Sequence, residues 1–148
     1  MTNLELTQHR RIILFHKQGT SARTRFLRFA DDTVCSFAPL PKLAQVLGGT
    51  DTRQQPAVEI HPAVLLKEAA HRLQLPLTAF ELEPEYGMWV DAPGGAIRIL
   101  LAGFTTIDPP FAAAEAVGAG FIDLTEARDL SGVELLLLRR AYEVILGG

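Results

Sequence analysis

The last helix-forming segment places the strongest constraint on what this chain can fold into. Residues 133–146 read VELLLLRRAYEVIL, and Ser131 followed by Glu134 predicts a capping box at the start of a helix. At 100° per residue, the apolar side chains of this helix cover about 220° of its circumference. A surface helix needs an apolar stripe of only about 100°. The segment therefore has apolar area for two neighbours.

Two arrangements cover that additional apolar area, and the sequence favours neither. In one, the helix is sandwiched inside the domain. In the other, one flank packs on a sheet and the other on a second copy of the chain, since a monomer would otherwise expose a sizeable apolar patch. The interface predicted for the second arrangement contains Leu135, Leu138, Tyr142 and Leu146.

The first third of the chain predicts mostly strands. Residues 10–17 form an apolar strand, and residues 24–38 predict a hairpin with its turn at Asp31 and Asp32. Residues 39–49 predict a short helix closed by two glycines.

The rest of the chain predicts both helices and strands. A helix is expected between Pro62 and Pro76. Strands follow over residues 77–85 and 86–104, the second range containing a Pro-Gly-Gly hairpin turn and a central apolar strand. An alanine-rich helix over 109–117 is expected next, and then a short strand or a turn of helix over residues 121–130.

This order of elements predicts a single α+β domain over residues 1–148. The sheet is expected to be mainly antiparallel and built from hairpins, with about three to four helices covering one face. A mixed sheet is the alternative, because Phe104 can lead into a crossover through the alanine-rich helix.

Composition narrows the classes of partner that the chain can bind. The 148 residues carry a net charge of −3, with a pI near 5.8, which gives no electrostatic case for binding nucleic acid. No apolar run is long enough to span a bilayer, and no signal peptide is recognisable, so no membrane partner is expected. Cys35 stands alone and excludes an intrachain disulfide, which favours the reducing cytoplasm.

No catalytic, cofactor-binding or metal-binding residue is predicted. Cys35 has no neighbouring histidine to act as a base, and the four histidines lack the spacing of a metal site. Glu81, Glu83 and Glu85 would share one face of a strand. That face is solvated, binds a cation or meets a basic partner, and the sequence leaves these alternatives open.

These observations favour a non-catalytic cytoplasmic protein-interaction or regulatory module, homodimeric through its C-terminal helix. Its partner is a second copy or another protein. The alternative is a small-molecule-binding protein or enzyme, with its site between the sheet and the alanine-rich helix 109–117. The candidate ligand contacts there are Trp89, Thr105, Thr106, Asp108 and Glu115, chosen mostly for their position near a strand end.

Overall fold

Strand β1 (Arg10–Lys17) organises the sheet because it is apolar on both faces. In the computed structural model, which describes residues 9–46 and 61–147, β1 lies parallel to β7 (Gly95–Phe104). Ile13 and Leu101 are partners in this register, and both are fully buried. The two strands form the centre of the sheet, as predicted for the apolar part of β7.

The described strands form one mixed sheet in the order β4-β6-β7-β1-β2-β8, with β3 also paired to β1 and β5 to β7. The remaining strands are β2 (Thr24–Arg28), β3 (Cys35–Ser36), β4 (Gln45–Val46), β5 (Phe80–Leu82), β6 (Met88–Ala92) and β8 (Gly120–Ile122). Among the described strands, every pair except β1–β7 is antiparallel. The predicted α+β class, with a mainly antiparallel sheet, is confirmed.

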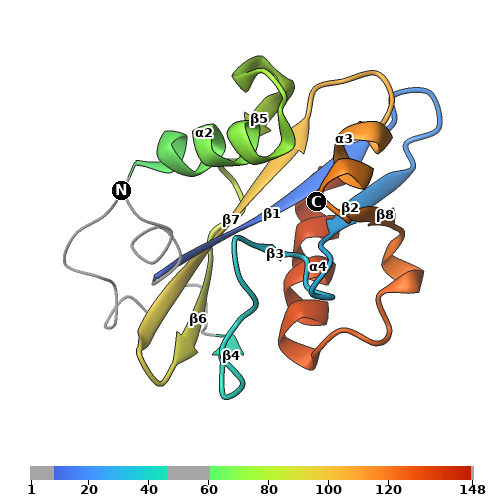
Figure 1. Ribbon diagram of the computed structural model, residues 1–148. Helices are drawn as coiled ribbons and strands as arrows, with labels where there is room; N and C mark the ends of the chain where they lie inside the picture. Colours follow the sequence, from blue (N-terminus) through green and yellow to red (C-terminus); the bar gives the residue numbers. More distant parts are fainter. Residues whose placement is uncertain (1–8, 47–60, 148) are drawn as a thin grey trace.

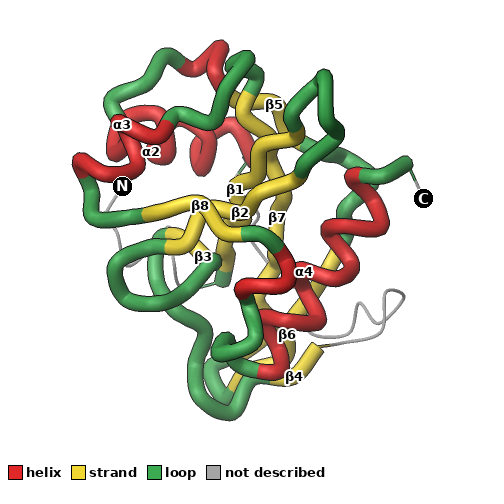
Figure 2. Tube along the Cα trace, turned by 90° about the vertical axis from the view of Figure 1, so that its right-hand side faces the viewer, coloured by secondary structure: helices red, strands yellow, loops and turns green. Residues whose placement is uncertain are grey.

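Helices cover both faces of the sheet, so the prediction of one covered face is wrong. Helices α2 (Pro62–Leu73) and α3 (Phe111–Ala116) lie on one side of β1 and β7, and α4 (Gly132–Ile145) lies on the other (Figures 1 and 2). Successive residues of β1 are the reason: Ile12 and Leu14 pack with the α2 side, and Ile13 packs with the α4 side. A strand that is apolar at successive positions needs cover on both faces.

The predicted hairpin over 24–38 is also wrong. A turn does form, in which the Asp32 amide donates to the Phe29 carbonyl at 2.9 Å. However, β2 and β3 do not pair with each other: both are antiparallel to β1, β2 along one half of it and β3 along the other. Because β1 is long enough for two partners, the chain between them leaves the sheet. This brings residues 29–37 next to α2.

Residues 41–46 form a turn and a strand where a helix was predicted. The Ala44 amide donates to the Pro41 carbonyl at 3.2 Å, and β4 then pairs with β6 through Val46 and Val90. Pairing of β4 with β6 overrides the intrinsic helical preference of these residues. Residues 39 and 40 of the predicted helix are not helical either, and residues 47–49 lie outside the described residues.

Helix α2 agrees with its prediction. Pro62 is its first residue, and the preceding His61 caps it by accepting a hydrogen bond from the Ala63 amide at 3.1 Å. The helix ends at Leu73, because Gln74 adopts a left-handed conformation with φ of 54°. The end of α2 therefore comes slightly before the predicted stop at Pro76.

Helix α3 starts at Phe111, two residues later than the predicted start at residue 109. Pro110 occupies the N-cap position without any side-chain hydrogen bond. The residue before a proline is disfavoured in the helical region, so Pro109 cannot begin the helix. Of the alanines in residues 112–119, Ala114 and Ala119 are buried, so only part of this small-residue stretch packs closely.

Short 3-10 helices η1 (Leu77–Ala79) and η2 (Leu124–Glu126) complete the described elements. Residues 121–130 thus contain both predicted alternatives, since β8 ends in this range and η2 follows it. No helix within the described ranges has the length and apolar character to cross a bilayer.

Candidate functional site

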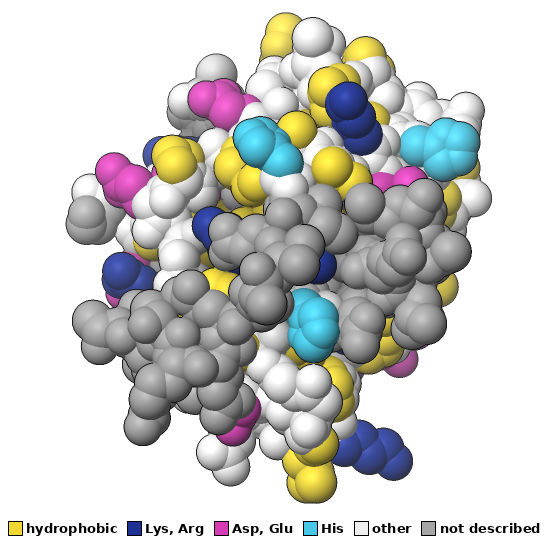
Figure 3. All heavy atoms as spheres, turned by 90° about the vertical axis from the view of Figure 1, so that its left-hand side faces the viewer, with side chains coloured by type: hydrophobic (Ala, Val, Ile, Leu, Met, Phe, Trp, Pro, Cys, Tyr) yellow, Lys and Arg dark blue, Asp and Glu magenta, His cyan; other side chains and the backbone are white. Residues whose placement is uncertain are grey.

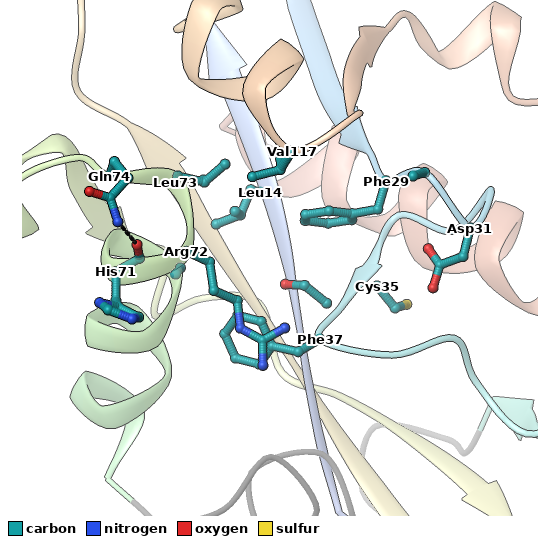
Figure 4. A pocket seen from close by; sticks show the side chains of 13 residues that line it. Leu14, Phe29, Asp31, Cys35, Phe37, His71, Arg72, Leu73, Gln74 and Val117 are labelled. Atoms are coloured by element: carbon teal, nitrogen blue, oxygen red, sulfur yellow. Dashed lines mark hydrogen bonds between the residues drawn. The ribbon is translucent and has the colours of Figure 1, made fainter.

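A cavity of about 630 Å³ opens on the α2 side of the sheet. Residues 29–37 form one wall, the last turns of α2 form the opposite wall, and Val117, just after α3, closes part of the rim (Figure 4). Leu14 of β1 forms the floor. This space, the α2 cavity, has the volume of a small-molecule site.

The lining of the α2 cavity is mostly apolar. Among the described residues, its apolar members are Leu14, Phe29, Ala30, Cys35, Phe37, Ala69, Leu73 and Val117, and its polar members are Asp31, Ser36, His71, Arg72 and Gln74. Sites for small molecules typically combine such an apolar surface with a few polar groups that orient the ligand.

Arg72 places a cation in the wall of the cavity. Its guanidinium carbon lies 4.2 Å from the centroid of the Phe37 ring, which is a cation–π contact. Its Nε donates to Glu68 Oε1 at 2.9 Å, an ion pair between residues four positions apart on α2. These contacts tie residues 29–37 to α2 and fix the width of the cavity.

Cys35 and Ser36, the two described lining residues that carry a thiol or hydroxyl nucleophile, are not activated. Burial raises the pKa of the Cys35 thiol far above its usual range, and the negative charge of Glu134 adds to this shift. The Ser36 hydroxyl donates to the Ile12 carbonyl at 3.0 Å. The thiol is therefore a poor nucleophile, and the Ser36 hydroxyl is engaged with the backbone of β1.

Glu134, on α4, holds the outer part of the cavity wall in place. This carboxylate is 7% exposed and accepts hydrogen bonds from the Val34 amide at 3.0 Å and from the Thr33 hydroxyl. The same hydroxyl accepts from the Cys35 amide at 3.1 Å. A side chain on the α4 side thereby positions the segment whose aromatic residues line the α2 cavity.

The predicted capping box at Ser131 is therefore only half formed. The Ser131 hydroxyl accepts from the Glu134 amide at 3.2 Å, as expected for an N-cap. The Glu134 carboxylate accepts from residues 33 and 34 and, at 3.4 Å, from the Ser131 hydroxyl, and not from the Ser131 amide as a full capping box requires. In the sequence, Glu134 lies in the middle of the apolar arc of the helix, and this position is the signal that its side chain is buried against another segment.

None of the predicted ligand contacts lines the α2 cavity. Trp89 is buried on β6, and Glu115 is exposed on α3. The hydroxyl of Thr105 donates to a backbone carbonyl of η1 at 2.7 Å, and that of Thr106 donates to the Asp108 carbonyl at 2.7 Å. The two threonines therefore order the loop after β7.

The predicted interface residues differ widely in exposure. Leu138 is fully buried in the core of the chain itself, so its side chain is not available to a partner. Leu135 and Tyr142 are half-buried against the same core, and Leu146 is 50% exposed. The homodimer stays a prediction, but most of the apolar arc that suggested it is used within the chain.

The burial of the α4 side chains shows how much of this apolar arc is covered within the chain. The buried positions span about 100° of the helix circumference, and half-buried residues extend the contact on both flanks. The buried positions are Glu134, Leu137, Leu138, Ala141 and Ile145, and the flanks are Val133, Leu135, Tyr142 and Val144. This pattern is that of a surface helix packed on one neighbour, the sheet, with half-buried residues on both flanks.

No candidate metal site emerges. The described residues contain no group of three or more His, Cys, Asp or Glu side chains placed to hold an ion. Histidine side chains lie well apart on the face shown in Figure 3. Strand β5 ends at Leu82, so Glu83 and Glu85 lie beyond it, and the prediction that the three glutamates share a strand face is wrong.

Sequence comparison adds no assignment to this geometry. The chain matches no model of a known protein family, and no curated protein is significantly similar to it in sequence.

Proposed function

We propose that this chain is a non-catalytic binding protein whose α2 cavity accepts a small, largely apolar molecule. The observation that supports this function most strongly is the cavity itself, about 630 Å³ in volume and lined mostly by apolar side chains. It lies on the same face of the sheet as the site expected beside the alanine-rich helix, but between α2 and residues 29–37.

The chemistry of the lining supports binding over catalysis. The Cys35 thiol has a strongly raised pKa, because burial disfavours its thiolate. The Ser36 hydroxyl is committed to a backbone carbonyl of β1. A ligand in this cavity would meet apolar surface and a polar rim.

Filling the rim of the cavity tests this function. Val117 is 39% exposed, so Val117→Trp places a large side chain at the opening without disturbing the core. A neutral fragment library is screened by thermal shift against the wild-type chain. A ligand at a hundred times its dissociation constant stabilises a protein by about 2.7 kcal/mol. We expect hits that stabilise the wild type and not Val117→Trp.

Leu136→Trp is the matched control, because Leu136 is 51% exposed on α4, on the opposite side of the sheet. It should respond to the same fragments as the wild type. Fragments that stabilise all three proteins equally would bind elsewhere, and a library without hits would count against the proposed function.

A second candidate function is contact with another protein, including a second copy of the chain. A smaller hollow of about 340 Å³ near the end of α4 supports it, lined by Glu85, Arg140, Glu143, Val144 and Leu146. An apolar side chain of a partner would sit beside Leu146, with charged groups around it. In this function the chain is a regulatory module, homodimeric through its C-terminal helix.

Light scattering after size-exclusion chromatography tests this second candidate. Leu146→Glu should dissociate a dimer, whereas Leu136→Glu, on the charged side of α4, should not. A wild-type chain that remains monomeric at high concentration would contradict the homodimer.

We propose a cytoplasmic location. Its support is Cys35, a free and buried thiol of the kind that reducing compartments maintain. Fractionation of cells that produce the protein checks this proposal, and recovery outside the soluble intracellular fraction would contradict it.

A further inference from the structure

Arg72 gives the α2 cavity a flat, delocalised surface as well as a charge. Its guanidinium is stacked on Phe37 at 4.2 Å, and Figure 4 shows it in front of that ring. A guanidinium makes hydrogen bonds at its edges and stacking contacts on its two faces. The bond from Nε to Glu68 uses an edge, so it does not compete with a second stacking partner.

The position of this guanidinium is already fixed. Phe37 holds it from one face and Glu68 from one edge, while the side chain keeps 33% of its surface exposed. Immobilising a long side chain during binding costs conformational entropy, and a preorganised side chain avoids much of that cost. A ligand that stacks on Arg72 therefore meets a prepared platform.

The other walls suit a planar and uncharged molecule. Phe29, Leu73 and Val117 supply apolar surface around the platform (Figure 4). Glu68 compensates the charge of Arg72, and Asp31 adds a negative charge at the rim. An anionic ligand thus gains little attraction here, whereas the face of an aromatic ring is favoured by the cation.

We infer that the ligand of the α2 cavity is a neutral, planar aromatic molecule that stacks on Arg72, forming a three-layer arrangement with Phe37. This inference rests on the proposed function of the cavity. It adds the chemical class of the ligand and the residue that selects it.

A pair of alcohols with similar volume tests the selection. 2-Naphthol and decahydro-2-naphthol share a two-ring carbon skeleton and one hydroxyl group, and differ in aromaticity. Both are titrated into ¹⁵N-labelled protein, and shifts are followed by NMR. We expect 2-naphthol to bind about fivefold to tenfold more tightly, the range of a partly desolvated cation–π contact. Its ring current should also shift the Arg72 Hε resonance upfield.

Arg72→Lys keeps the positive charge and removes the planar group. In this variant, 2-naphthol should lose its advantage over decahydro-2-naphthol. Arg139→Lys, on the exposed side of α4, is the matched control and should keep the wild-type preference. Phe37→Leu keeps an apolar wall but removes the ring beneath the guanidinium, and should reduce the preference partially. Thermal unfolding of each variant verifies that it is folded.

The outcomes separate the inference from the function on which it rests. If both alcohols bind the wild-type cavity equally, the inference is wrong and the binding function stands. A preference for 2-naphthol that survives in Arg72→Lys also overturns the inference. If neither alcohol binds to the wild-type cavity, the proposed function fails together with the inference.

Discussion

The two faces of the sheet are covered in different ways, and only one of them is closed. Helix α4, with 14 residues, covers one face, buries its central positions in the core and packs half-buried flanks against it. The other face is shared by α2, with 12 residues, and α3, with only 6. The difference teaches that a single long helix covers one face of this sheet, whereas two shorter ones leave a cavity on the other.

The closed face also supports the open one. Glu134 on α4 accepts hydrogen bonds from Val34 and Thr33, and this fixes the start of the segment that reaches Phe37. Arg72 then ties that segment to α2. The shape of the α2 cavity thus depends on contacts made from both sides of the sheet.

The largest effect is expected when the closed face loses a core side chain. Leu138 belongs to α4 and is fully buried, whereas Leu73 is buried but borders the α2 cavity. Leu138→Ala should therefore cost about 4–5 kcal/mol of the free energy of unfolding, and Leu73→Ala about 2–3 kcal/mol. Urea denaturation of the two variants measures the difference.

Leu138→Met and Leu73→Met are the controls, because they roughly conserve volume and should each cost less than about 1.5 kcal/mol. Equal losses from the two alanine substitutions would show that the faces are packed alike. The inference that the α4 face is packed more tightly than the α2 face would then be wrong.

An intermediate effect is expected where the two faces are connected. Glu134→Gln keeps the shape of the side chain but replaces charged acceptors in a buried site. The loss should be about 1–3 kcal/mol. It should also speed hydrogen exchange at the Val34 amide more than at the amide of Leu101 in the sheet centre. Unchanged exchange at Val34 would refute the positioning role of Glu134.

The smallest effect is expected for an exposed ion pair that belongs to neither packed face. Arg23 hydrogen bonds to Asp123 and lowers the pKa of that carboxyl group. A lowered pKa in the folded state stabilises the protein above the unfolded pKa of about 3.9, and this contribution is lost as the pH falls. Arg23→Gln should lower the urea midpoint slightly at pH 7 and less at pH 3. A loss that grows on acidification would contradict this sign.

Local sequence patterns predicted most of the elements. The apolar runs of β1 and β7, the prolines flanking α2 and the Pro-Gly-Gly turn before β7 are each encoded by neighbouring residues. The errors arose where partners are distant in sequence. The turn at Asp32 resembles a hairpin, but the choice of β1 as the common partner of β2 and β3 depends on the whole sheet.

The candidate site was beyond the reach of such patterns. Phe37 and Arg72 are separated by 35 positions in the numbering, and Val117 comes from a third segment. Each looks ordinary in its local sequence, and only the packing of three element ends brings them together. By contrast, the loop threonines were selected for lying near a strand end, and their hydroxyls satisfy nearby carbonyls instead.

The separate anchoring of β2 and β3 on β1 has a consequence for variation of this fold. In a true hairpin, the number of residues in the connection sets the alignment of its two arms. Here each arm is aligned by β1, so residues can be inserted or deleted around Asp31 without displacing either strand. The entrance of the cavity can therefore change shape with loop length, while the scaffold stays the same.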